Sequence, residues 1–163
     1  MSVITRIGWA SSPAVRKSML ANRSSGTAPE LVMARALRRA GLKYRGSRTH
    51  GQPLPYSPDF VVEGGVCVFV DGCFWHVCPT HGMRPKTNRG YWLPKLDENR
   101  RRDRRATRAC ADAGLSVLRV WECRLRSDAD AVAGEVAQAL LAHCLGQQTV
   151  RRLRPIRASR RKR

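Results

Sequence analysis

Long hydrophobic runs are absent from this chain of 163 residues. No segment reaches the roughly 20 apolar residues of a membrane span, and residues 1–9 hold no apolar stretch long enough for a signal peptide. The sequence therefore predicts a cytoplasmic protein with no membrane partner. In that reducing compartment, the six cysteines favour metal binding over disulfides.

Acidic residues are scarce, with 12 Asp and Glu against 31 Lys and Arg, and the formal net charge is +19. This charge would concentrate the protein on a polyanion. Most of the basic residues are arginines, which fork onto phosphate and stack on bases. The composition therefore favours DNA or RNA as the partner, although a ribosomal or membrane-surface protein can share it.

The pattern of apolar residues predicts six elements in the order helix, strand, strand, helix, strand, helix. They cover roughly residues 27–41, 59–63, 66–70, 88–113, 117–123 and 128–145. Gly64 and Gly65 form a hairpin turn between the first two strands, and the nearly all-apolar second strand is expected at the centre of the sheet. This order indicates a small α/β domain with a mixed β-sheet flanked by helices.

At this length the chain is expected to form one domain with a buried core. We assign the domain to residues 27–146. Residues 1–26 are predicted to form a basic arm that lies along DNA, with a short helix packed through Met19 and Leu20 as the alternative. Residues 147–163 are rich in arginine and poor in apolar groups, so we expect a disordered tail.

Metal-ligating side chains crowd into residues 71–81. The candidates are Asp71, Cys73, His76, Cys78 and His81, and Cys123 follows a later hydrophobic run. A structural zinc ion takes four Cys or His ligands from a close group and a distant partner. We predict a zinc site formed by Cys73, Cys78, His81 and Cys123. Small buried thiols are the alternative, and the spacing from Cys73 also makes His76 a candidate ligand.

Three acidic residues are placed for chemistry. Asp59 and Asp71 begin and follow the predicted hairpin, so they reach the same end of it. Asp59 suits Mg²⁺, which takes one or two carboxylates plus phosphate oxygens. Asp103 lies on the inward face of the helix over 88–113, where a lone buried carboxylate is costly. It is therefore either paired, for example with a neighbouring arginine, or catalytic, and His76 could exchange protons because histidine titrates near neutral pH.

These residues together resemble the very short patch repair endonucleases, bacterial enzymes that nick DNA at T·G mismatches. The matching motifs lie within residues 14–125 and are Thr27-Ala28-Pro29-Glu30, Pro58-Asp59-Phe60-Val61-Val62, Gly72-Cys73-Phe74-Trp75-His76, Pro85-Lys86-Thr87-Asn88, Tyr91-Trp92, Asn99, Arg102-Asp103 and Val120-Trp121-Glu122-Cys123. The resemblance implies a restriction-endonuclease-like core, with a mixed sheet flanked by helices and a structural zinc site.

The resemblance also implies roles for single residues. Asp59 and the backbone carbonyl of Val70 would bind catalytic Mg²⁺, His76 would be the general base, and Asp103 would support it. DNA contacts would come from Met19, Phe74, Trp75, Trp92, Lys86 and Asn88, with Glu30 and Asn99 beside the site. The three aromatic residues are either wedges that unstack a base step or part of the core.

Two positions depart from the family pattern. Thr80 stands where the family has a zinc cysteine, so His81 is the predicted replacement. Val70 and Asp71 stand where the family has a threonine and a histidine. We expect that Asp71 binds Mg²⁺ as a second carboxylate.

The sequence thus predicts a Mg²⁺-dependent endonuclease that nicks one strand of DNA beside a T·G mismatch arising from 5-methylcytosine deamination, and so starts very short patch repair. The expected partners are mismatched double-stranded DNA, mismatch-repair proteins and a DNA polymerase. The protein is expected to be a monomer in the bacterial cytoplasm, associated with the nucleoid when on DNA. The alternatives are a nickase of the same fold with another target and a non-enzymatic zinc protein that binds DNA.

Overall fold

The computed structural model describes residues 25–46, 56–83 and 85–156. Its elements are α2 (Ala28–Arg39), β1 (Tyr44–Gly46), β2 (Phe60–Val62), β3 (Val66–Asp71), α3 (Arg89–Asp112), β4 (Ser116–Trp121), α4 (Glu122–Cys144) and β5 (Val150–Arg152). The six predicted elements are present in the predicted order, and two short strands, β1 and β5, are added. The predicted wedge residue Met19 and nearly all of the predicted arm lie outside the described residues.

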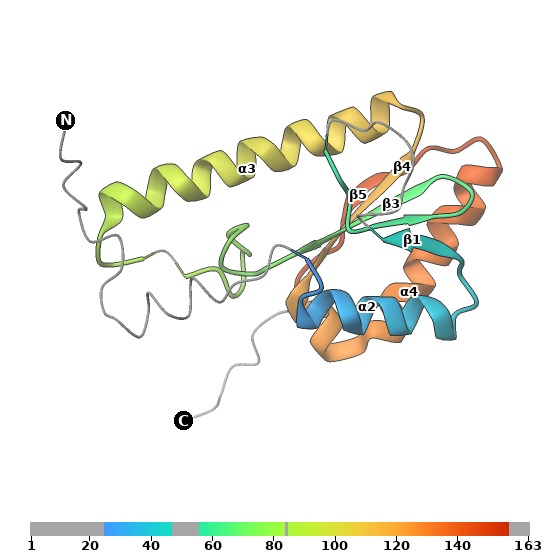
Figure 1. Ribbon diagram of the computed structural model, residues 1–163, viewed down its shortest axis with the longest axis horizontal. Helices are drawn as coiled ribbons and strands as arrows, with labels where there is room; N and C mark the ends of the chain where they lie inside the picture. Colours follow the sequence, from blue (N-terminus) through green and yellow to red (C-terminus); the bar gives the residue numbers. More distant parts are fainter. Residues whose placement is uncertain (1–24, 47–55, 84, 157–163) are drawn as a thin grey trace, which may run out of the picture.

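The sheet has five strands in the order β1-β2-β3-β4-β5 (Figure 1). The pairs β1–β2 and β2–β3 are antiparallel, whereas β3–β4 and β4–β5 are parallel. The predicted mixed sheet and the central position of the apolar strand β3 are confirmed. Gly65, in the turn before β3, has a φ of +104°, a conformation that favours glycine, and a Cβ atom there would lie 2.4 Å from His143 Nε2, so the imidazole would also have to move.

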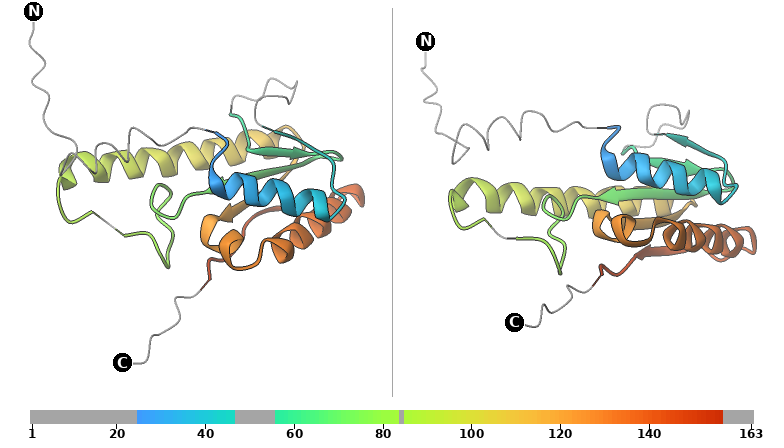
Figure 2. Two further views of the ribbon diagram at one scale, coloured as in Figure 1. Left: turned by 60° about the horizontal axis from the view of Figure 1, so that its bottom comes forward. Right: turned by 90° about the horizontal axis from the view of Figure 1, so that it is seen from below.

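Helices cover both faces of the sheet, as the views in Figure 2 show. Alternation along β3 and β4 separates two cores. Val68 and Leu118 face α2 and α4 in the larger core, whereas Cys67 and Val117 pack with Cys110 of α3 in a smaller core on the other face. The same alternation directs Asp71 and Arg119 to the α3 face, and this places charged side chains beside an apolar layer. None of the described helices has the length and hydropathy of a membrane-spanning segment.

The prediction of a disordered tail is wrong for residues 150–152. They form β5, whose Val150 pairs with Val117 of β4, and the next residue, Leu153, is 2% exposed and belongs to the larger core. The high charge of the segment suggested disorder, but backbone pairing, the burial of Leu153 and the ion pairs of Arg152 hold it on the domain. Residues 157–163 lie outside the described part of the chain.

Three predicted boundaries also need correction. The strand predicted over 117–123 ends at Trp121, so Cys123 lies in the first turn of α4. Helix α4 begins earlier than predicted and has non-helical φ/ψ at Asp128, where the carboxylate accepts a hydrogen bond from Ala131 N at 2.8 Å and caps the second part. Residues Tyr44–Gly46 lie outside the six predicted elements, yet they pair with β2 as an edge strand.

Candidate active site and metal centre

A cleft of about 730 Å³ opens between the beginning of α2, the end of β3 and one side of α3. The residues of interest on its wall are Glu30, Asp59, Val70, Asp71, Trp75, His76, Asn99 and Asp103. The structure therefore brings the three predicted catalytic residues to one cavity, although they come from positions 59, 76 and 103 of the chain. Val70 and Asp71 end β3 there, and the loop after β3 carries His76.

His76 and Asp103 form a direct pair, with 2.7 Å between Nδ1 and Oδ2. A carboxylate acceptor favours the proton on Nδ1, which leaves the lone pair of Nε2 for another proton. Burial opposes ionisation of Asp103, but the hydrogen bond from His76 and the charge of Arg119 lower its pKa. The pair can therefore hold an imidazole oriented and stabilise it when it becomes charged.

Asp59 accepts a hydrogen bond from the backbone N–H of Val70, at 2.6 Å to Oδ2. Burial raises its pKa to about 7, against the effect of this hydrogen bond, and the nearby carboxylates of Glu30 and Asp71 raise it further. A buried carboxyl whose ionised form is disfavoured by other acids gains from a divalent cation. The donor chemistry at Asp59 and Val70 therefore fits Mg²⁺.

The Asp71 carboxylate is held by two arginines that the sequence analysis missed. Arg119 of β4 donates two hydrogen bonds to it, from Nε to Oδ2 at 2.9 Å and from Nη2 to Oδ1 at 2.5 Å. Nη2 of Arg152, in β5, lies 2.9 Å from Oδ2. Both Asp71 oxygens are thus engaged, so the structure does not support Asp71 as a second magnesium ligand. Asp71, His76 and Asp103 lie close enough to suggest a metal group, but the guanidinium groups supply the compensating charge.

Arg119 also reaches the His76–Asp103 pair, because its Nη2 donates to Asp103 Oδ1 at 2.8 Å. Arg152 lies 3.3 Å from Asp103 Oδ2 and stacks over Trp121, with 4.6 Å from its guanidinium carbon to the ring centroid. One signal for Arg119 was present in the sequence. A single charged residue in the apolar strand over 117–121 needs a buried partner. Nothing in the sequence pointed to Arg152, which follows a polar stretch.

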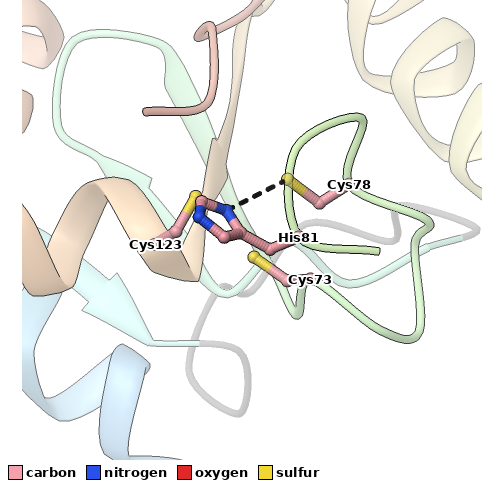
Figure 3. A group of neighbouring side chains, drawn as sticks. All are labelled: Cys73, Cys78, His81 and Cys123. Carbon is pink, nitrogen blue, oxygen red and sulfur yellow. Dashed lines mark hydrogen bonds between the residues drawn. The ribbon is translucent and has the colours of Figure 1, made fainter. Parts of the chain in front are cut away.

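Cys73, Cys78, His81 and Cys123 converge on one point (Figure 3), and one ligand atom from each lies within 4.8 Å of the others. Zinc–sulfur bonds of about 2.3 Å place tetrahedral ligands roughly 3.8 Å apart, and Cys78 Sγ lies 3.9 Å from His81 Nδ1. The donor set and its spacing therefore fit a structural zinc ion. His76 is not in this cluster, since it pairs with Asp103.

The loop that carries three of these ligands is tightly wound. Cys78 N donates to Cys73 O at 2.8 Å, and Gly82 N donates to Cys78 O at 2.7 Å. A Cβ on Gly82 would lie 2.5 Å from Cys78 O, so only glycine lets the chain turn there. Cys73 N also donates to Glu122 at 3.0 Å, which fastens the loop to the first turn of α4 beside Cys123.

The predicted wedge aromatics form one cluster beside the cleft. The ring centroid of Phe74 lies 5.2 Å from that of Trp75 and 5.6 Å from that of Trp92. Trp92 is 7% exposed, which favours a core role, while Phe74 and Trp75 are half-buried. Asn99 donates to the backbone oxygen of Trp75 at 3.1 Å, so it positions the cluster.

Glu30 lies on the cleft wall at the beginning of α2. Its carboxylate accepts hydrogen bonds from Thr27 Oγ1 and Gly26 N, each at 2.8 Å. Lys86 is exposed in the loop before α3, and Asn88 has a φ of +51° at the N-terminus of that helix. These two residues lie apart from the cleft wall, so no contact in the structure tests their predicted role.

Comparisons with known proteins bear on this site. Residues 11–81 match the family described as DNA mismatch endonuclease Vsr. The type II nicking enzyme V.NaeI of Lentzea aerocolonigenes is 47% identical over 116 residues, which cover 69% of this chain and 70% of that protein. The DNA mismatch endonuclease Vsr of Escherichia coli K12 is 40% identical over 112 residues, which cover 68% and 70%. The type II nicking enzyme V.XorIIP of Xanthomonas oryzae is 40% identical over 108 residues, which cover 63% and 75%.

Proposed function

Because the chain belongs to the Vsr family of DNA endonucleases, we propose that it nicks one strand of duplex DNA beside a T·G mismatch by Mg²⁺-dependent hydrolysis. Membership of the family supports nuclease activity, action on DNA and a restriction-endonuclease-like fold. The preference for a T·G mismatch, the dependence on Mg²⁺ and the cutting of one strand are our proposal. The observation that supports it best is the convergence of Asp59 with the His76–Asp103 pair in one cleft.

In this proposal His76 accepts a proton from the attacking water at Nε2. Asp103 holds the Nδ1 proton in place and stabilises the imidazolium that results. Asp59 and the Val70 carbonyl would hold Mg²⁺, which when bound neutralises charge on the scissile phosphate. Arg119 and Arg152 form ion pairs with Asp71 and Asp103, and these contacts fix the position of the His76–Asp103 pair.

Structural zinc is proposed at Cys73, Cys78, His81 and Cys123. Their close approach supports it, because four Cys and His ligands in a tetrahedral arrangement form a closed structural site. The ion would fix the loop that carries His76 and the aromatic pair of Phe74 and Trp75. Trp75 is proposed to stack beside the mismatch, where a weakly paired base step is easiest to unstack.

A second candidate function is nicking in another sequence context. Relatives described as type II nicking enzymes favour it, and so does the Asp71–Arg119 pair at the position where the family pattern has a histidine. The alternative of a non-enzymatic zinc protein is not favoured, because the family is one of endonucleases and the candidate catalytic residues share a cleft. A monomeric state, a cytoplasmic location and mismatch-repair partners stay predictions.

The test is a nicking assay with Mg²⁺ on duplexes that differ only in one base pair, T·G or a matched pair. Wild-type protein should nick the T·G duplex in one strand, and Asp59→Asn should bind that duplex without cutting it. Asp97→Asn is the matched control, since Asp97 is an exposed acid of α3 outside the cleft. Equal cutting of matched DNA would support the second candidate and contradict the T·G proposal.

A further inference from the structure

A second cavity, of about 480 Å³, lies on the other side of α3 from the cleft and is bounded by β5. Asp103 and Arg119 form part of the wall of both cavities. Arg102 faces the cleft, whereas Arg100 and Arg104 face the second cavity. The helix and the Asp103–Arg119 contact thus separate the two spaces.

Arginine dominates this second cavity. Its charged wall residues are Arg100, Arg104, Arg108, Arg119 and Arg152, against Asp103 and Asp112. Three of these arginines recur at four-residue steps along α3, so helical geometry places them in one row. Arg119 of β4 and Arg152 of β5 form part of the cavity wall on the side of the sheet.

The row along α3 is not neutralised by neighbouring acids. Arg100 has only a long contact with Asp97, at 3.8 Å, and neither Arg104 nor Arg108 forms an ion pair with a carboxylate that the structure describes. The arginines on the outer face of α3 differ, because Arg101 and Arg105 share Glu98. Available positive charge is therefore concentrated on the side of α3 that borders the cavity.

We propose that this cavity is a phosphate-binding site for a nucleic-acid backbone, separate from the catalytic cleft. Arginine's planar fork matches phosphate oxygens in two-point contacts. Eight residues of helix span about 12 Å, which is long enough for the row to face more than one phosphate of a strand that lies beside α3. The charge of the row excludes a metal cation and disfavours an apolar ligand.

The inference rests on the DNA-directed activity of the family and does not depend on which base pair is the target. The phosphates can belong to the duplex in the cleft, where it continues past α3, or to a second nucleic-acid strand. Both sources use the same contacts. If the phosphates belong to the duplex in the cleft, each protein should bind one duplex at saturation. If they belong to a second strand, each protein should bind a second short duplex when the duplex is in excess.

The experiment compares two double variants that each remove two positive charges from α3. Arg104→Ala with Arg108→Ala empties the cavity row, and Arg101→Ala with Arg105→Ala is the matched control on the outer face. All four residues are exposed, so both variants should keep the wild-type melting temperature. Binding to a fluorescent T·G duplex is measured without Mg²⁺ at several salt concentrations, and nicking is measured separately with Mg²⁺.

The cavity variant should lower the slope of log affinity against log salt by about two, because each lost phosphate contact contributes about 0.9. The control should keep the wild-type slope. Equal salt slopes for the two variants would overturn the inference. A wild-type protein that does not nick T·G duplexes would refute the proposed function alone, since the slopes would still report on the cavity.

Discussion

Replacing Arg119 with methionine tests whether the buried charges hold the fold and the site together. The side chain of Arg119 is 7% exposed, and it contacts both Asp71 and Asp103, whose side chains are 2% and 10% exposed. Methionine keeps much of the volume but leaves two buried carboxylates with less compensating charge. Breaking a buried ion pair in this way costs about 3–5 kcal/mol of unfolding free energy.

The measurement is urea unfolding of the wild type, Arg119→Met, Asp71→Asn and the double variant. Because Asp71 and Arg119 share two hydrogen bonds, we expect the double variant to be more stable than the sum of the single losses predicts, by about 1–3 kcal/mol. Arg39→Met is the control. Arg39 pairs with Asp130 on the surface, with side chains 56% and 70% exposed, and such pairs contribute about 0–1 kcal/mol.

Nicking by Arg119→Met should also fall, since Asp103 loses a partner that lowers its pKa. The profile of rate against pH should then change, whereas a purely structural loss would scale the rate equally at every pH. If Arg119→Met loses no more stability than Arg39→Met, or if the two substitutions at positions 71 and 119 are additive, the proposed network does not exist as described.

Three further predictions follow from the site. Cys123→Ser should release zinc, measured by mass spectrometry under native conditions, while Cys144→Ser, at an exposed thiol, should retain it; zinc retained by both variants would contradict the proposed ligands. Mg²⁺ affinity, measured by calorimetry, should fall as the pH drops below about 7, because protons then compete for Asp59, and Asp59→Asn should abolish this dependence; a pH-independent affinity would place the metal elsewhere. Trp75→Ala should lose the preference for T·G over matched duplexes, with little change in melting temperature. Trp92 is more buried, so Trp92→Ala should lower the free energy of unfolding by about 3–5 kcal/mol. A loss of stability in Trp75→Ala and of mismatch preference in Trp92→Ala would mean that Trp92 contacts DNA and Trp75 belongs to the core.

The fold could be predicted where apolar patterning was strong. The nearly all-apolar run ending at Val70 specified a central strand, and the spacing of Trp92, Leu96 and Cys110 specified a long helix with one buried face. Strand β5 could not be found in this way, because it has only three residues and its pattern is fully exposed. Its position depends on pairing with β4 and on Leu153, and both are tertiary contacts.

The sequence was sufficient to predict which types of side chain would form the site, but not which charged side chains would pair with one another. Cysteine and histidine spacing indicated which residues approach Cys123, although it lies 50 positions after Cys73. Asp103 was predicted to be either paired or catalytic, and the structure pairs it with His76 and Arg119. The pairing of Asp71 with Arg119 and Arg152 depends on strand alignment, which local sequence does not encode.

Two of the proposed zinc ligands lie just beyond the paired ends of the two central strands. Asp71 of β3 is paired with Trp121 of β4, and Cys73 and Cys123 each follow two residues later, in the loop after β3 and in the first turn of α4. A zinc ion bound there would stabilise the register of β3 against β4. A shift of one residue between the two strands would separate the two thiolates and turn the side chains of the shifted strand to the opposite face of the sheet. The zinc ion would also close a chain loop of about 50 residues, a slow and entropically costly step in folding. We therefore expect metal loading to speed folding of the sheet as well as stabilise it, so that the strand alignment that carries Asp71 and Arg119 is selected while the chain is still folding.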